Sequence, residues 1–168
     1  MTYYSNMDTP LGKVYIVCGD EAVYSVFIEG QHHTVPDSAL PGNSHPMVLR
    51  VKNWLTDYFA GNTPAPDRLP LAPAGTAFQT QVWNMLLTIP YGKTVTYGDL
   101  ARKFTDRKMS AQAIGQAVGK NPISIIIPCH RVMGNGNRLT GYDGGIHKKV
   151  HLLQHEGIDT SRMIFPNI

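Results

Sequence analysis

The sequence predicts an α/β protein in two parts: a small N-terminal antiparallel sheet with one helix, then a mainly helical part that holds a helix-turn-helix. Short runs of β-branched and aromatic residues fill the first third of the chain. A stretch with four prolines, residues 61–76, follows them and is typical of a surface linker. Beyond it, apolar residues recur at helical spacing. We therefore expect an N-terminal α/β domain with its linker at 1–74 and a C-terminal helix-turn-helix domain at 75–168.

Composition excludes several classes of protein. With 42% apolar and 16% charged residues, the 168-residue chain is globular rather than disordered. It has no apolar run long enough to span a membrane, and its first residues lack the basic and apolar regions of a secretory signal. The two cysteines, Cys18 and Cys129, are far apart in the sequence, which argues against a disulfide framework or a cysteine-rich zinc site. We expect a cytoplasmic protein.

The N-terminal elements follow from short patterns. Lys13–Cys18 and Ala22–Ile28 are separated by Gly-Asp-Glu, which predicts a hairpin, and Tyr3–Met7 predicts an edge strand. Met47–Phe59 has its apolar residues near one face of a helix. Cys18 ends an apolar strand and is typical of a small buried hydrophobe. None of these elements carries chemistry.

Three histidines in this part, His32, His33 and His45, raise the question of a metal site. They lie in the stretch GQHHTVPDSALPGNSHP, which is rich in glycine and proline and has no regular ligand spacing. The sequence therefore favours a loop there and predicts no metal site.

Helix starts are well marked after the linker. The pairs Thr76/Gln79 and Thr96/Asp99 match the capping-box pattern, and Ser110 is a favourable N-cap. Two short helices with a tight connection are typical of a helix-turn-helix. The expected helices begin after Thr76, cover Tyr97–Phe104 and cover Ala111–Val118.

The last of these helices has almost no side-chain bulk. Ala111, Ala113, Gly115 and Ala117 alternate along it, and a glycine within a helix loses about 1 kcal/mol against alanine. The small residues are explained either by close helix packing or by close approach to the backbone of a partner. The sequence alone leaves both explanations open.

The charge is distributed unevenly along the chain. Residues 1–77 carry four Lys and Arg against seven Asp and Glu, a net charge of −3, whereas residues 78–168 carry eleven against five, a net charge of +6. A basic C-terminal half favours a polyanionic partner such as nucleic acid, although a solvated basic surface has the same composition.

The segment 123–128 is an apolar run that predicts a buried strand or extended segment, and it leads into Cys129-His130-Arg131. A free thiol has a pKa of about 8.5, and a nearby imidazolium or guanidinium would lower it. A buried cysteine beside a surface His-Arg pair is the structural alternative. Glu156 ends a predicted helix, 146–156, where the helix dipole disfavours an acid. We expect it to pair with a cation such as His130.

Three sequence stretches carry a resemblance to a known family. NPISIIIPCHRVMGNGNRLTGYDGG, with IPYGKTVTYGDLA before it and LLQHEG after it, resembles the O6-alkylguanine-DNA alkyltransferases, or methylated-DNA–protein-cysteine methyltransferases, of the bacterial constitutive type. The resemblance is strong over residues 75–158 and loose over the N-terminal part. It implies a ribonuclease H-like N-terminal domain, a winged-helix-like C-terminal domain, and direct-reversal DNA repair.

The resemblance also implies catalytic roles. Cys129 would accept the alkyl group from the O6 atom of guanine, or from the O4 atom of an O4-alkylthymine, in a single turnover without a cofactor. His130 would deprotonate Cys129 through a water, and Glu156 would orient the imidazole. Asn121 would fix the turn before the cysteine, and Tyr97 would donate to the leaving purine. The partner would be double-stranded DNA containing O6-alkylguanine, bound by a monomer.

Further positions are implied for the pocket and for DNA. The second helix of the motif would enter the minor groove, whose width of about 6 Å requires small residues, and the damaged base would flip out of the duplex. Gln112 stands where many members place an arginine, so DNA binding would depend more on other groups, and Asp143 would restrict bulky alkyl groups. The implied pocket residues are Val132, Tyr142, Asp143 and Ser124. The implied DNA-binding residues are Ser110, Ala111, Gln112, Gly115, Lys120 and Arg131.

Two other functions compete with this one. A cysteine hydrolase using Cys129 and His130 would turn over repeatedly, but it explains neither the basic C-terminal half nor the small-residue helix. A damage-binding sensor without transfer would lack the acceptor cysteine, whereas Cys129 is present.

Overall fold

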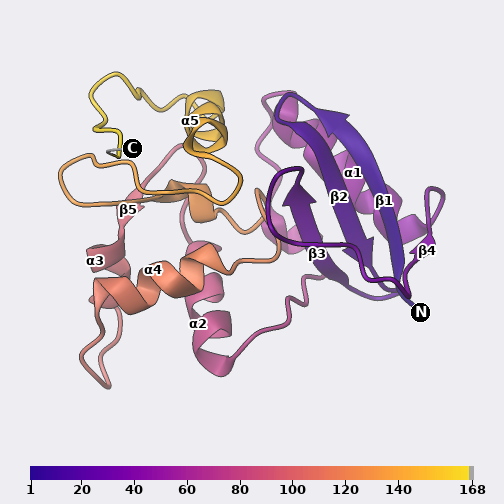
Figure 1. Ribbon diagram of the computed structural model, residues 1–168, viewed down its shortest axis with the longest axis horizontal. Coiled ribbons are helices and arrows are strands. Elements are labelled where there is room, and N and C mark those ends of the chain that lie inside the picture. The colour runs from indigo at the N-terminus through magenta and orange to yellow at the C-terminus, as the bar shows by residue number, and fades with distance from the viewer. Residues whose placement is uncertain (167–168) are drawn as a thin grey trace. The chain divides into compact units, whose positions relative to one another are not determined.

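The computed structural model describes residues 1–166 and contains two compact units (Figure 1). Unit 1 comprises Met1–Ala74 and Pro122–Ile126, and unit 2 comprises Gly75–Asn121 and the chain from Ile127 onward. The short segment 122–126 belongs to unit 1 because it bonds to a strand there: the Val26 amide donates to the Pro122 carbonyl (3.0 Å), and the Ser124 amide donates to the Val26 carbonyl (2.7 Å).

Unit 1 contains a four-stranded sheet in the order β3-β2-β1-β4. Its first three strands form an antiparallel meander, which confirms the predicted hairpin. Because β4 pairs in parallel with the outer side of β1, the prediction that the first strand lies at the edge is wrong. The strands are β1 (Tyr3–Thr9), β2 (Gly12–Cys18), β3 (Val23–Ile28) and β4 (Leu40–Pro41).

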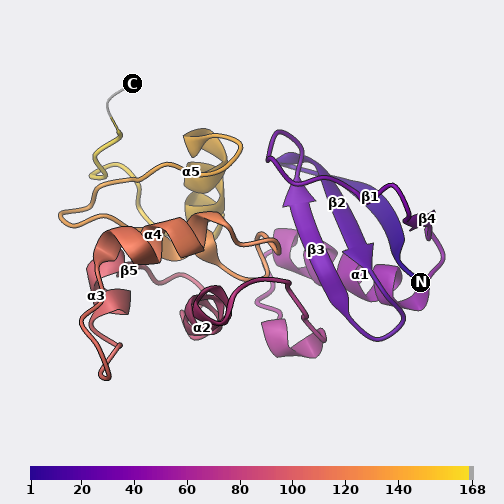
Figure 2. The ribbon, with the colours of Figure 1, turned by 60° about the horizontal axis from the view of Figure 1, so that its bottom comes forward.

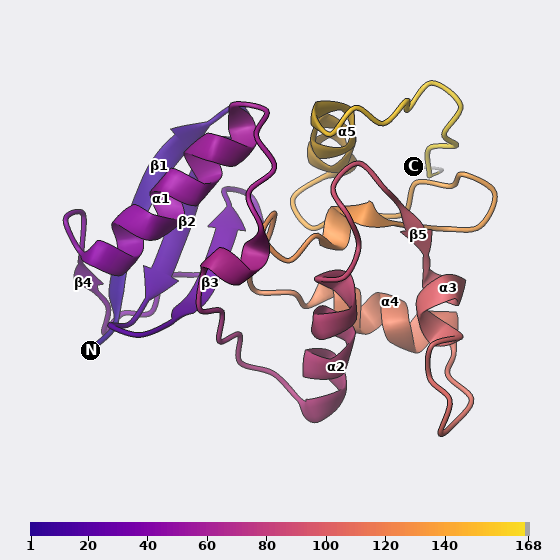
Figure 3. The ribbon, with the colours of Figure 1, turned by 180° about the vertical axis from the view of Figure 1, so that it is seen from behind.

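Helix α1 (Pro46–Phe59) lies across one face of this sheet (Figure 3) and confirms the helix predicted from Met47 onward. It buries Val48, Val51 and Leu55, which recur at helical spacing. His45 caps its start, since Nδ1 accepts a hydrogen bond from the Met47 amide (3.1 Å).

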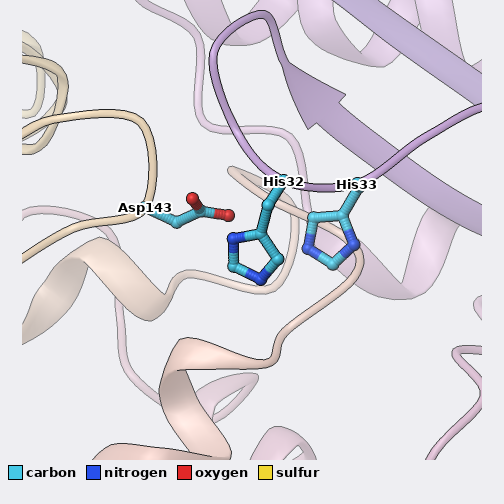
Figure 4. Close-up of side chains that lie close together, drawn as sticks. All are labelled: His32, His33 and Asp143. Atoms are coloured by element: carbon cyan, nitrogen blue, oxygen red, sulfur yellow. The ribbon is translucent and has the colours of Figure 1, made fainter.

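The other two histidines of this region lie in the loop after β3. The rings of His32 and His33 stack with 5.2 Å between their centroids (Figure 4). The third residue drawn in Figure 4, Asp143, belongs to unit 2.

Unit 2 is mainly helical, and its helix starts agree with the sequence. Thr76 and Thr96 both form complete capping boxes, and the Ser110 hydroxyl accepts from the Ala113 amide (3.1 Å). Figure 2 shows α4 running across the front of this unit, next to α2 and α3. The elements are α2 (Ala77–Leu86), β5 (Val95–Thr96), α3 (Tyr97–Ala101), α4 (Ala111–Gly119), the 3-10 turn η2 (Cys129–Arg131), β6 (Val132–Met133) and α5 (Ile146–His155).

Helix α3 is shorter than expected. It ends at Ala101, and the chain then turns so that the Phe104 ring meets the Phe78 ring of α2, with 5.7 Å between centroids. No helix among residues 1–166 combines the length and the apolar character needed to cross a bilayer.

The apolar segment before Cys129 is buried, as predicted, but beyond the bridge at Ile123 it is neither the strand nor the extended segment that the sequence predicts. It folds as tight turns, in which the Ile126 amide donates to the Ser124 carbonyl and the Cys129 amide to the Ile127 carbonyl (2.8 Å each). Ile125 is fully buried with a φ of 71°, which is unfavourable for a β-branched residue. Neighbouring packing therefore holds a strained turn, and this turn leads through Pro128 into η2.

Candidate active site

Cys129 is the first residue of η2, directly after the turn at Pro128, and it is 9% exposed. Burial raises the pKa of its thiol. Hydrogen bonds from the side chains of Asn121 and Tyr142 and the positive charge of Lys149 oppose this effect without outweighing it. Because the pKa stays high, the thiol needs a base to become a nucleophile.

Glu156 is the centre of a buried polar cluster at the end of α5. Its carboxylate accepts hydrogen bonds from His130 Nε2 (2.6 Å), Arg131 Nε (2.8 Å) and the Gly92 amide (3.0 Å). Burial alone would raise the pKa of Glu156, but these hydrogen bonds and the neighbouring charges hold it well below its usual value. The carboxylate is therefore ionised at neutral pH, and the expected pairing with His130 is present.

This carboxylate determines which nitrogen of the His130 ring carries the hydrogen. Burial lowers the pKa of His130, and the charges of Arg131 and Lys149 lower it further, although Glu156 opposes both. The imidazole is therefore neutral at pH 7. We assign its single ring hydrogen to Nε2, which donates it to Glu156. Nδ1 then carries the lone pair; it is buried and bonds to no protein group within residues 1–166. The ring can accept a proton at this atom.

Asn121 follows α4 and is 4% exposed. Its Nδ2 donates to the Ile127 carbonyl (2.9 Å), two residues before the cysteine, and its side chain also bonds to the Cys129 thiol. One amide thus holds the backbone turn and contacts the sulfur that the turn presents.

Tyr97 is the first residue of α3, and its hydroxyl lies 2.6 Å from Thr140 Oγ1. Lys149, which is 1% exposed, donates from Nζ to the same Thr140 oxygen (3.1 Å) and to the Val132 carbonyl (2.7 Å). Burial raises the pKa of Tyr97 and lowers that of Lys149 to about 8. At neutral pH Tyr97 therefore keeps its proton and is a hydrogen-bond donor near a reactive sulfur.

Comparison with known proteins identifies the family. The model of the 6-O-methylguanine DNA methyltransferase DNA-binding domain matches residues 77–158. A methylated-DNA–protein-cysteine methyltransferase of Haemophilus influenzae is 38% identical over 93% of this chain and 87% of its own length. The one from Shigella flexneri is 42% identical over 89% and 92%. The chain belongs to the methylated-DNA–protein-cysteine methyltransferase family.

Solved structures of the family also match. The crystal structure of Mycobacterium tuberculosis OGT in complex with DNA is 37% identical to this chain, with a TM-score of 0.81, and the match covers 96% of this chain and 94% of that one. The mixed α/β architecture of this family member, with its small sheet and its helices, is therefore that of a solved relative.

The structure brings together only part of the pocket expected for this family. Tyr142 is half-buried and its side chain lowers the pKa of the Cys129 thiol, and Asp143 is half-buried beside it in the sequence. The Val132 side chain is wholly buried. Ser124 belongs to unit 1 and is 2% exposed, and its hydroxyl donates to Gln31 Oε1 (3.0 Å). The pocket role expected for Ser124 stays a prediction.

The expected DNA-binding residues also divide into two groups. Ser110, Ala111 and Gln112 are exposed at the start of α4, and Lys120 is exposed at its end. Arg131 is not available to DNA, because its guanidinium is buried against Glu156 and donates to the Ile89 carbonyl (2.6 Å). The side chains that lower the pKa of the Cys129 thiol are those of Asn121, Lys149 and Tyr142, so the expectation that His130 and Arg131 lower it is wrong.

The small residues of α4 have a packing role on one side. A Cβ at Gly115 would lie 3.6 Å from the Tyr97 ring, and the Trp83 indole of α2 donates to the Ala117 carbonyl (2.9 Å). A groove of about 700 Å³ lies between the start of α2 and α4. Its lining residues are Thr76, Phe78, Gln79, Ala113, Gly115, Gln116, Ala117, Gly119 and Lys120.

Sequence reasoning missed Lys149 and Thr140. The signal for Lys149 was present, because it lies three residues after Ile146 and four before Leu153, on the apolar face of the predicted helix. A lysine at such a position is either buried with partners or displaces the helix. No comparable signal marks Thr140.

Proposed function

We propose that this protein repairs alkylated DNA by moving the alkyl group from the O6 atom of guanine to Sγ of Cys129, once per molecule. The observation that carries this function is the buried pair of Glu156 and His130 beside Cys129. The carboxylate accepts the hydrogen on Nε2 of the imidazole, so Nδ1 is available as a proton acceptor. Relatives 38–42% identical to the chain bear the name methylated-DNA–protein-cysteine methyltransferase. A hydrolase and a sensor without transfer are both less favoured.

The chemistry of this group of residues is an in-line displacement. His130 and Cys129 are neighbours in the sequence, so their side chains point in different directions, and His130 takes the thiol proton through a bridging water. Glu156 stabilises the imidazolium that forms. Sγ then bonds to the alkyl carbon as the bond from that carbon to O6 breaks, and its electrons move to the purine. Tyr97 donates to the purine as negative charge develops on it.

The product explains why each molecule would act once. An S-alkyl cysteine is a thioether, which has no leaving group that water displaces. The damaged DNA is itself the alkyl donor, so no cofactor takes part in the step.

We further propose that α4 binds in the minor groove of double-stranded DNA while the damaged base flips out toward Cys129. The exposed first turn of α4, with Gln112, and the basic half of the chain support this. Gln112 fills the position of the everted base without adding charge. A relative's crystal structure contains DNA.

Finer features of the fold and setting are part of this proposal. We assign unit 1 to the ribonuclease H-like folds and the helix-turn-helix of unit 2 to the winged-helix type, with a domain boundary between residues 74 and 75. The sheet with one helix and the pair α3–α4 support these assignments. A cytoplasmic monomer that binds one lesion fits the single transfer.

The function is tested with two matched cysteine variants. An oligonucleotide duplex with O6-methylguanine labelled on its methyl group is mixed with wild type, Cys129→Ser or Cys18→Ser. We expect label on the wild type and on Cys18→Ser, because Cys18 is buried in the other unit and its pKa is raised to about 11. Cys129→Ser should bind the duplex without taking label. Label on Cys129→Ser would overturn the proposal.

A further inference from the structure

We propose that Thr140 is a positioning residue that directs the hydroxyl proton of Tyr97 away from the protein and toward the reacting purine. The inference rests on the proposed function and deepens it, since it assigns to a threonine the orientation of the leaving-group donor. The observation that carries it is the chain of hydrogen bonds from Lys149 through Thr140 to Tyr97.

The direction of these hydrogen bonds follows from what each group can donate. A lysine ammonium has donors only, so Thr140 Oγ1 must accept from Lys149 Nζ at 3.1 Å. The Thr140 hydroxyl has one hydrogen of its own, and Tyr97 Oη, at 2.6 Å, is the one acceptor it contacts within residues 1–166. Thr140 therefore donates to Tyr97, because the opposite direction would leave the threonine hydrogen without an acceptor.

Tyr97 then has its own hydrogen free to point elsewhere. Its ring is half-buried beside Gly115 of α4, where an added Cβ would make ordinary contact with it at 3.6 Å. For a given position of the ring, the remaining freedom is rotation of the hydroxyl hydrogen. The hydrogen bond from Thr140 removes that freedom, so the donor is aligned before the substrate arrives.

Lys149 ties this arrangement to the nucleophile. Its positive charge lowers the pKa of Cys129, while its Nζ holds Thr140 and the Val132 carbonyl. During transfer, negative charge leaves the sulfur and appears on the purine. The ammonium of Lys149 therefore stabilises the negative charge on the sulfur before transfer. Through Thr140 it also orients the Tyr97 hydroxyl, which donates to the purine as the charge appears there.

The test uses the rate of methyl transfer in a single turnover for Thr140→Val, Thr140→Ser and a matched control, Thr160→Val. Thr160 is also a threonine of unit 2, but its hydroxyl bonds to Gln154. We expect Thr140→Val to slow transfer by about 10-fold to 100-fold, less than the roughly 10²–10³-fold lost when a donor is removed outright. Thr140→Ser should restore most of the rate, and Thr160→Val should transfer at the wild-type rate.

A double-mutant cycle with Tyr97→Phe separates positioning from a general effect on the pocket. If Thr140 acts through the tyrosine hydroxyl, Thr140→Val has no further effect once that hydroxyl is absent. An equal slowing in the Tyr97→Phe background, or a wild-type rate for Thr140→Val, would overturn the inference. Thr140→Ala removes the same hydroxyl and replaces the valine variant if that one does not fold.

The two proposals fail in different ways. A wild-type protein that takes no label on Cys129 refutes the proposed function and the inference with it. A wild type that transfers normally, together with an unaffected Thr140→Val, refutes the inference alone.

Discussion

Replacing Glu156 by glutamine should destabilise the protein strongly. The change removes the carboxylate that accepts from His130, Arg131 and Gly92, and it leaves the guanidinium of Arg131 buried without a counterion. Removing one partner of a buried ion pair costs about 3–5 kcal/mol. For a chain of this size each kcal/mol lowers Tm by roughly 2–4 °C, so Tm should fall by roughly 6–20 °C.

A second substitution separates this loss of stability from a loss of chemistry. The double variant Arg131→Met/Glu156→Gln removes both charges of this ion pair and leaves neither partner buried alone, so much of the lost Tm should return. Transfer should not return, because a glutamine amide can donate to His130 Nε2 and move the ring hydrogen to Nδ1. Nδ1 would then no longer accept the thiol proton. The corresponding Asp-to-Asn change beside the catalytic histidine of a serine protease lowers the rate by about 10⁴-fold, so we expect transfer to slow by about 10³–10⁴-fold.

The assays are differential scanning calorimetry and single-turnover transfer at a temperature where all variants are folded. A Glu156→Gln protein as stable as wild type would show that the carboxylate does not compensate Arg131. A refolded double variant that transfers near the wild-type rate would show that the ring hydrogen of His130 is not set by Glu156, and the proposed base would be wrong.

Three further outcomes follow from the site and from α4. Lys149→Met should raise the pKa of Cys129, so single-turnover transfer should be slower at neutral pH; the difference from wild type should narrow above pH 8, where Lys149 itself loses its charge. Gln112→Arg should strengthen DNA binding and make it more dependent on salt, because it adds a positive charge to α4; binding titrations at several salt concentrations measure this, and an unchanged affinity together with an unchanged salt dependence would argue against α4 in the interface. Gly115→Ala should stabilise the protein by up to about 1 kcal/mol in denaturant unfolding, because the added methyl makes ordinary contact with Tyr97; a lower midpoint would show that this contact is too tight.

Local patterns predicted much of the fold. Capping boxes at Thr76 and Thr96 and the N-cap at Ser110 depend on residues a few positions apart, and all three helices begin where these patterns placed them. The end of α3 was less predictable, because it depends on the long-range contact between Phe104 and Phe78. The turns before Cys129 were missed for a similar reason, since a run of isoleucines favours a strand unless packing imposes a positive φ at Ile125.

The site could be predicted only where a residue conflicted with its local setting. Glu156 at a helix C-terminus indicated a cationic partner; the structure places the guanidinium of Arg131 there, together with the neutral ring of His130. Closeness in the sequence did not predict contacts at the site. Arg131 lies two residues after Cys129, yet its guanidinium bonds to Glu156 and to the Ile89 carbonyl. The partners of Thr140 are distant in the sequence, so no spacing rule could reveal its place beside Tyr97.

The most direct measurement is peptide mass spectrometry of the protein after exposure to an excess of duplex DNA containing O6-methylguanine. The peptide with Cys129 should gain the mass of one methyl group in place of the thiol hydrogen, and the lesions repaired should equal the protein present. An unmodified Cys129, or repair of more lesions than there are protein molecules, would contradict irreversible transfer to this sulfur.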